Sequence, residues 1–317
     1  HFWAASINDL FAVDQHDKWL RFGLALHTRI EPFSGCIMWM RVWHSNRNPQ
    51  LILSYYLDTL MELSHMPLVT QSDLGTENFG IANGHTLLCQ WHDPALQGML
   101  QHCWMRTKKN VMPEIMWSQL QHRFTPNFEN LLDTGVHNGW YNAGNTLQIM
   151  IFHWIFIPWL QTELNAYKDH VNNTAKRHDH NKVLPHGIPE LIYNSPEDFG
   201  VLDFKVCLSL PGAINCIRNA YINPSHTIFD LVLPTLSDHL ASCYDHLRCP
   251  IITRDSIWGV YLDMLNVIQL SDDLPAEIMP TDDYKLPLFT DHEDLHFQED
   301  DSSFYYMGGV RGGHGIG

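Results

Sequence analysis

The feature that most constrains the fold is the alternation of short apolar strands and helical repeats over the first 175 residues. The strand-like segments are residues 21–31, 35–44, 67–73 and 102–106, and helical patterns begin near residues 49, 80, 113 and 145. The turn EPFSG joins the first two strands and predicts an antiparallel hairpin. Asn48 followed by Pro49 predicts the start of the first helix. This order predicts an α/β domain with a mixed sheet flanked by helices.

The second half of the chain has weaker signals. Residues 201–270 hold amphipathic segments that predict a helical extension of unknown role, following a core domain over residues 5–200. Residues 271–317 form an acidic and then glycine-rich tail, for which we expect disorder because it is highly charged and poor in apolar groups. Eleven acids face a single lysine between Asp272 and Asp301, so this stretch carries −10 of the net charge of −16.

Composition narrows the class of protein. The most apolar run, Leu147–Leu160, is shorter than the ~20 residues needed to span a bilayer, so we expect a buried helix and no membrane segment. Seven cysteines without a framework spacing favour a reducing compartment. The negative net charge argues against general nucleic-acid affinity, although most of that charge belongs to the tail.

Three carboxylates stand at positions that suit a functional site. Asp14 lies in the segment FAVDQHDKW, expected just before the first strand, and Asp73 closes the strand PLVTQSD. Glu114 lies in the first turn of the helix predicted from Pro113. Singly, each carboxylate also fits a structural role, as a turn residue, a cap, or an acid at the positive end of a helix.

Together, the three carboxylates and their surroundings resemble the integrase catalytic core, in particular transposon-derived integrase-core proteins. The matching segments are VDQHDKW with GLALHTRIEPFSG, SDLGTENFGIA, NVMPEIMW and HGIPELIY, and the resemblance covers residues 5–200. It implies an RNase-H-like, DDE-type fold and Mg²⁺-dependent polynucleotidyl transfer on DNA.

The resemblance also implies roles for individual residues. Asp14, Asp73 and Glu114 would bind Mg²⁺ or Mn²⁺, with Asp14 bridging two ions. A second group would support these ligands or face DNA: Gly75, Glu77, Asn78, Lys108, Lys109 and Asn110. Gly75 would let the backbone turn closely beside Asp73. A nuclear location would follow from the same resemblance, and a homo-oligomer is left open.

Two departures from the family pattern keep other functions open. The family's Asp-Gly-Phe-Ser-Arg turn reads EPFSG here, and Ile115 follows Glu114 where the family often has a basic residue. One alternative is a catalytically silent, domesticated module that binds nucleic acid or protein, and another is an RNase-H-like nuclease. The sequence also contains a possible zinc site elsewhere in the chain. Its four ligands would be His239, Cys243, His246 and Cys249.

Overall fold

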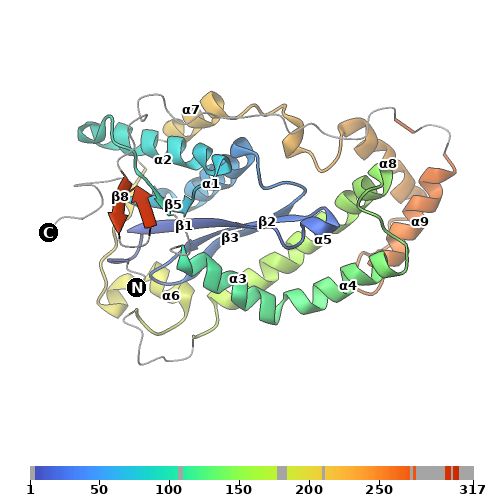
Figure 1. Ribbon diagram of the computed structural model, residues 1–317, viewed down its shortest axis with the longest axis horizontal. Helices are drawn as coiled ribbons and strands as arrows, with labels where there is room; N and C mark the ends of the chain where they lie inside the picture. The colour runs from blue at the N-terminus through green and yellow to red at the C-terminus, as the bar shows by residue number, and fades with distance from the viewer. Residues whose placement is uncertain are drawn as a thin grey trace.

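A mixed β-sheet forms the centre of the fold, with helices on both of its faces (Figure 1). Five strands from the first 105 residues follow the order β3-β2-β1-β5-β6 in this sheet. They are β1 (Leu10–His16), β2 (Ala25–Glu31), β3 (Cys36–Trp43), β5 (Val69–Asp73) and β6 (His102–Met105). β1, β2 and β3 pair antiparallel, whereas β5 runs parallel to both β1 and β6. This arrangement is the RNase-H-like α/β fold that the sequence predicts.

The structure, a computed structural model, describes most of the chain. The described residues are 4–105, 110–176, 184–208, 211–271, 274–275, 297–300 and 303–306.

The position of Asp14 in the structure differs from the one that the sequence predicts. The prediction that Asp14 precedes the first strand is wrong, because Asp14 lies inside β1. The first four residues of β1 are buried, so the segment lacks the alternation of a half-buried strand, and its polar end resembles a turn.

One face of the sheet is covered by α1, α2 and α7 (Figure 1). Val13 of β1 and Trp39 of β3 pack against apolar side chains of these helices. α1 begins as predicted, since the Asn48 side chain accepts a hydrogen bond from the Gln50 backbone N–H and Pro49 is the first helical residue. The bounds are α1 (Pro49–Leu63), α2 (Phe79–His92) and α7 (Pro211–Tyr221). α7 lies within the predicted extension, so part of this extension packs on the core domain.

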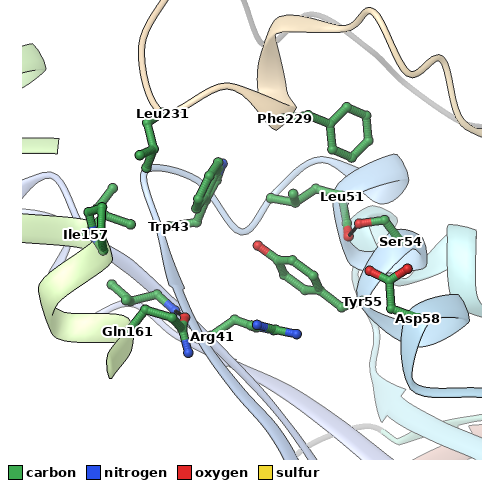
Figure 2. Close-up of a pocket in the computed structure, with 12 residues that line it drawn as sticks. Arg41, Trp43, Leu51, Ser54, Tyr55, Asp58, Ile157, Gln161, Phe229 and Leu231 are labelled. Atoms are coloured by element: carbon green, nitrogen blue, oxygen red, sulfur yellow. Dashed lines mark hydrogen bonds between the residues drawn. The ribbon is translucent and has the colours of Figure 1, made fainter. Parts of the chain in front are cut away.

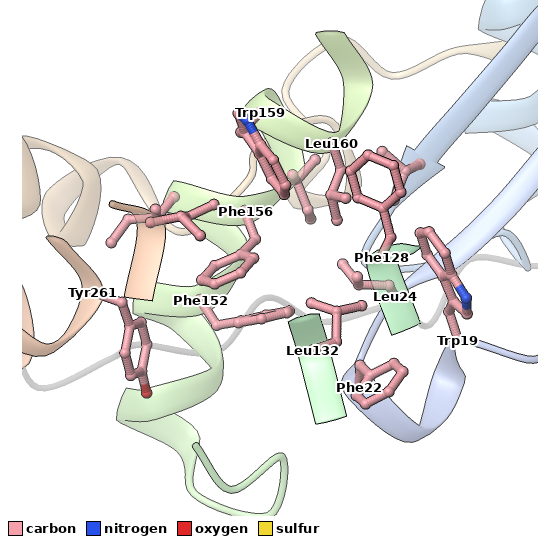
Figure 3. Packing of buried hydrophobic residues seen from close by; sticks show 14 of the residues in the cluster. Trp19, Phe22, Leu24, Phe128, Leu132, Phe152, Phe156, Trp159, Leu160 and Tyr261 are labelled. Atoms are coloured by element: carbon pink, nitrogen blue, oxygen red, sulfur yellow. The ribbon is translucent and has the colours of Figure 1, made fainter. Parts of the chain in front are cut away.

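The other face carries the larger hydrophobic core, part of which Figure 3 shows. Phe152 and Phe156 of α5 lie among side chains of α4, α9 and the segment around Trp19. Most of the run Leu147–Leu160 is buried in α5, which confirms the predicted buried helix. In the described residues, no helix is both long and apolar enough to cross a membrane. The helices are α3 (Val111–Arg123), α4 (Thr125–His137), α5 (Thr146–Asn172), α8 (Pro234–His246) and α9 (Ile257–Gln269).

Short elements complete the described fold. β4 (His65–Met66) and β7 (Val206–Cys207) form a separate antiparallel pair, and α6 (Pro189–Asn194) is a short helix. The 3₁₀ helices are η1 (Leu20–Phe22), η2 (Thr76–Asn78), η3 (Pro94–Leu96), η4 (Pro196–Phe199) and η5 (Thr227–Phe229).

The outer edge of β3 is hydrogen-bonded by side chains of α5. The Asn172 amide accepts from the Ile37 N–H and donates to the Ile37 carbonyl oxygen, both at 2.8 Å. Gln161 accepts from the Val42 N–H at 3.0 Å and donates to the Met40 carbonyl oxygen at 2.9 Å. The helix rises about 16 Å between these two side chains, and β3 rises about 17 Å between Ile37 and Val42. The matching spacing lets one helix satisfy an edge that could otherwise pair with another chain.

Two short strands lie within the acidic C-terminal stretch. β8 (Phe297–Asp300) and β9 (Ser303–Tyr306) pair antiparallel, and β9 continues the sheet beyond β6. The expected disorder over 271–317 therefore does not extend to these two strands. A sheet edge can recruit a strand through backbone hydrogen bonds alone, which composition does not reveal. Most other residues of this stretch lie outside the described part of the chain.

Removing the Asn172 amide should weaken the fold. We expect Asn172→Ala to lower the free energy of unfolding by about 2–3 kcal/mol, because the Ile37 N–H and carbonyl would lose their partner. Urea unfolding followed by tryptophan fluorescence measures this change. Asn173→Ala is the matched control, since the neighbouring Asn173 is exposed and its side chain donates to the Asp169 carbonyl oxygen in the last turn of α5. Equal losses in the two variants would contradict the role of α5 at this edge.

Candidate active site

Asp14 and Asp73 lie at matching positions on neighbouring parallel strands. The register of β1 and β5 pairs Ala12 with Gln71. Continuing this register by two residues aligns Asp14 with Asp73. Because side chains alternate along a strand, both aspartates point to the same face as Ala12 and Gln71. The parallel pair thus brings two carboxylates together at the C-terminal end of both strands.

α3 brings a third carboxylate, Glu114, to this edge of the sheet. Glu114 lies in the first turn of α3, and its side chain is exposed. Asn110, directly before the helix, is buried and uses its side chain on both strands. Its Nδ2 donates to the Val13 carbonyl oxygen at 2.9 Å, and its Oδ1 accepts from Gln71 Nε2 at 3.1 Å. Since one amide bonds both β1 and β5, it fixes the start of α3 over the parallel pair.

One turn further along α3, Trp117 docks on β1. Its indole N–H donates to Asp14 Oδ2 at 2.9 Å. Its ring stacks on His16 with the centroids 4.7 Å apart and an interplanar angle of 15°. The hydrogen bond favours the charged form of Asp14 and orients its carboxylate. Trp117 therefore couples the position of the helix to the position of the central aspartate.

The three carboxylates lie within range of one another's charge. Burial and the negative charge of Asp73, with a smaller effect from Glu114, raise the pKa of Asp14 to about 7. Burial, Glu114 and Glu77 raise the pKa of Asp73. Carboxylates that share a site disfavour one another's charged form, and perturbed pKa values of this kind mark candidate functional sites.

The comparison with protein families agrees with this geometry. The integrase core domain model matches residues 2–190, a span that includes strands β1, β2, β3, β5 and β6 and the three carboxylates. The chain belongs to the integrase core domain family. A comparison with curated proteins gives no match. Integrase core domains generally carry out polynucleotidyl transfer, bind DNA and use divalent metal ions, and membership associates the chain with this activity at that general level.

The end of β5 in this integrase core suits a hard cation. Among the described residues, Asp73 Oδ1 and Asn78 Oδ1 are buried and have no hydrogen-bond partner. Asn78 Nδ2 donates to the Asp73 carbonyl oxygen at 3.4 Å, so the amide lies over the end of the strand. Buried oxygens without donors cost free energy, and carboxylate and amide oxygens are the ligands that Mg²⁺ and similar ions prefer. The residues present therefore fit a divalent cation.

The side chains are not gathered into a complete metal-binding group. Within the part of the chain that the structure describes, no three His, Cys, Asp or Glu side chains come together to hold an ion. Asp14 is bonded to Trp117, and Glu114 is exposed. Carboxylates repel one another unless a cation offsets their charge. A cation would have to draw Glu114 inward, toward the two aspartates.

The loop after β5 supports this edge. Glu77 is buried, and Gln15 of β1 donates a hydrogen bond from Nε2 to Glu77 Oε1. Gly75 has extended backbone (φ −152°, ψ 142°), so it does not supply a left-handed turn. A Cβ at this position would displace the Glu77 carboxylate. Lys108 and Lys109 lie outside the described residues.

The departure from the family pattern at the β2–β3 turn lies away from the carboxylates. Glu31 is buried, and its carboxylate accepts from the backbone N–H groups of Phe33 and Ser34 at 3.1 and 2.7 Å. Gly35 has a φ of 71°, a left-handed conformation that favours glycine. Because β2 runs antiparallel to β1, this turn lies toward the opposite end of β1 from Asp14. The altered residues therefore build the turn and leave the acidic site unchanged.

The rival zinc ligands do not converge in the described structure. Cys243 Sγ lies 3.7 Å from His239 Nε2 on α8. His246 contacts the backbone of its own helix, and Cys249 Sγ donates to Asp245. These contacts are those of a helix with local polar pairs, and no metal-binding group is found among the residues described.

Sequence reasoning missed three residues that support the site: Trp117, Gln71 and Gln15. Trp117 is three residues after Glu114, so both lie on one side of α3. Gln71 is two residues before Asp73 and shares its face of the strand. Gln15 could have been found only with β1 assigned as a strand.

Replacing Asp14 by its amide should stabilise the metal-free protein at high pH. The pKa of Asp14 is raised to about 7 in the folded state, so its contribution to stability is fully present below about pH 4 and is lost as the pH rises through about 7. We expect Asp14→Asn to raise the midpoint of thermal unfolding by at least about 2 °C at pH 8, with no gain below pH 4. Unfolding in EDTA at several pH values measures this. A gain that does not depend on pH would contradict the electrostatic origin.

The same experiment reports metal binding without any activity assay. Mg²⁺ or Mn²⁺ should raise the unfolding midpoint of the wild-type chain, because a ligand that binds only the folded state stabilises it. The rise should be smaller in Asp14→Asn. Asp93→Asn is the control, since Asp93 is an exposed helix cap and asparagine caps equally well. It should respond to the ions like wild type.

Proposed function

We propose that this integrase core is a DNA-acting polynucleotidyl transferase whose divalent ions, Mg²⁺ or Mn²⁺, are held by Asp14, Asp73 and Glu114. One observation carries the proposal. Two aspartates align on parallel strands, and the first turn of α3 brings a glutamate into electrostatic contact with both. A sheet edge and a helix that converge in this way supply the oxygen ligands that a divalent ion requires.

Each residue of the site has a distinct task in this proposal. Asp14 lies on the central strand and would bridge the ions, with Trp117 orienting its carboxylate. Asp73 offers the buried oxygen Oδ1, and Asn78 offers a second oxygen close by. Bound ions would stabilise negative charge on the attacking and leaving oxygens of a phosphodiester. Because the pKa of Asp14 is about 7, ion binding near neutral pH would release protons from the site.

DNA contacts belong to the same proposal. Lys108 and Lys109 precede Glu114 by only a few residues, so they would meet phosphates close to the reacting bond. Glu77 would act through Gln15 and would not touch DNA, since it is buried. A nuclear location follows if the substrate is chromosomal DNA, and a homo-oligomer would let two sites act on two DNA ends.

A catalytically silent binding module is the second candidate. Ile115 leaves an apolar side chain 40% exposed beside Glu114, where the family often has a basic residue. Several surface cations of the described chain are already paired with acids, for example Arg21 with Asp133 and Arg47 with Asp17. Both features weaken attraction for phosphates. A nuclease is the third candidate, and it differs from a transferase in its product.

Amide replacement of the three carboxylates separates these candidates. We expect Asp14→Asn, Asp73→Asn and Glu114→Gln each to lower cleavage and joining of a labelled duplex end by at least about 100-fold in Mn²⁺ or Mg²⁺, because each removes charge that holds the ions. Affinity for the same duplex should stay equal or rise, since each change removes a negative charge near the phosphates. Gel assays of products and fluorescence anisotropy measure the two quantities.

A control variant and the identity of the reaction product distinguish the three candidate functions. Asp93→Asn should cleave and join like wild type. Hydrolysis without joining would favour the nuclease, and tight binding without cleavage by wild type would favour the silent module. Strong cleavage that survives the loss of Asp73 would contradict the proposed site altogether.

A further inference from the structure

A cavity lies at the β3 edge of the sheet, between α1, α5 and the segment 228–231. It has a volume of about 360 Å³ and is open on one side. Figure 2 shows Trp43 and Leu51 on opposite sides, with Phe229 and Leu231 above. The Trp43 indole N–H donates to the Ile228 carbonyl oxygen at 2.8 Å, which leaves the ring as an apolar wall. The walls are therefore mainly apolar and are fixed by contacts to the surrounding elements.

Most polar groups of this cavity are already used. The Gln161 amide bonds the β3 backbone, and the Ser54 hydroxyl donates to the Leu51 carbonyl oxygen at 2.7 Å. Asp58 binds Arg218 of α7 at 2.6 Å, so its charge is neutralised from outside the cavity. The side chains of Gln161, Ser54 and Asp58 therefore already have partners and do not need a ligand.

Arg41 and Tyr55 differ from the other polar groups. In the described part of the chain, the Arg41 guanidinium has no hydrogen-bond or carboxylate partner, and its Nε is buried. The Arg41 guanidinium lies over the Tyr55 ring, with Cζ 5.5 Å from the ring centroid. Figure 2 shows the Tyr55 hydroxyl directed into the cavity above Arg41. A cation without a partner in the described residues and a hydroxyl group therefore both line one mainly apolar cavity.

We propose that this cavity binds a small apolar carboxylate, with the carboxylate on Arg41 and Tyr55 and the apolar body between Trp43 and Leu51. A planar guanidinium matches a carboxylate with two parallel hydrogen bonds. The volume lies at the lower end of the ~300–1,000 Å³ of ligand pockets, which limits the occupant to about one or two rings. A phosphate fits less well, because its charge exceeds what the Arg41 guanidinium alone offsets. It also has no apolar group to lie between Trp43 and Leu51.

The cavity is separate from the acidic site. Arg41 and Trp43 lie on β3, two strands away from β1, and Tyr55 lies on α1, which covers the opposite face from α3. α1 leads directly into the segment that ends at Asp73. Ligand binding here does not require metal ions or DNA, so it can be tested independently of the proposed function.

Binding of 3-phenylpropionate to the full chain tests the proposal. We expect one equivalent to bind with a dissociation constant of about 1 mM or tighter, and to shift the Trp43 indole N–H signal in nitrogen-labelled protein. The neutral analogue 3-phenylpropionamide should bind at least about tenfold more weakly, because it cannot pair with the guanidinium charge. Inorganic phosphate should leave the Trp43 signal unchanged. Trp43→Phe assigns that signal.

Variants locate the charge. Arg41→Met should weaken binding of 3-phenylpropionate at least about tenfold, and Tyr55→Phe should weaken it less. Arg47→Met is the matched control, since Arg47 is exposed, pairs with Asp17 and lies outside the cavity. Asp73→Asn should bind the probe like wild type whether or not the chain is an active transferase.

Three results would overturn the proposal: no binding up to about 10 mM, equal affinity for acid and amide, or unchanged affinity in a folded Arg41→Met. Circular dichroism establishes that the variant is folded. If it does not fold, the comparison of acid with amide on the wild-type chain still decides the question.

Discussion

The parallel pairing of β1 with β5 is the contact on which the rest of the structure depends. Parallel neighbours cannot be joined by a tight turn, so the chain passes through β2, β3 and α1 before it returns as β5. The Asn110 side chain then bonds both strands and places α3 above them. A slip of one residue in this register would turn Asp14 and Asp73 to opposite faces. The site therefore depends on this register, which Asn110 helps to hold.

Side-chain amides substitute for backbone partners at several points. Asn172 and Gln161 bond the backbone at the edge of β3, and Asn110 bonds both β1 and β5. An amide carries both a donor and an acceptor, so it can satisfy the N–H and carbonyl of a strand at once. This arrangement packs α5 tightly along β3 while leaving the Arg41 cavity open above the same strand. The edge that gains stability from α5 thus also forms one wall of the proposed ligand site.

The buried groups of the acidic site lower the stability of the folded state, whereas the contacts elsewhere in the fold raise it. Burial raises the pKa of both aspartates, and two buried oxygens at the end of β5 have no donor among the described residues. Such local conflicts are expected at functional sites, since a site prepared for a cation is unfavourable without one. The surrounding contacts, among them the bond from Trp117 to Asp14 and the bond from Gln15 to Glu77, hold the carboxylates in place despite this cost.

The sequence by itself determined the α/β class, the start of α1, the buried helix α5, and the positions of Asp73 and Glu114 at a strand end and a helix start. These follow from local periodicity, caps and turns, which depend on neighbouring residues. Only the tertiary structure decided that Asp14 lies on the central strand, that Trp117 bonds it across 103 positions, and that Arg41 faces a cavity. A strand buried on both faces shows no alternation, and contacts between distant segments depend on how the elements pack. Local sequence patterns do not reveal this packing.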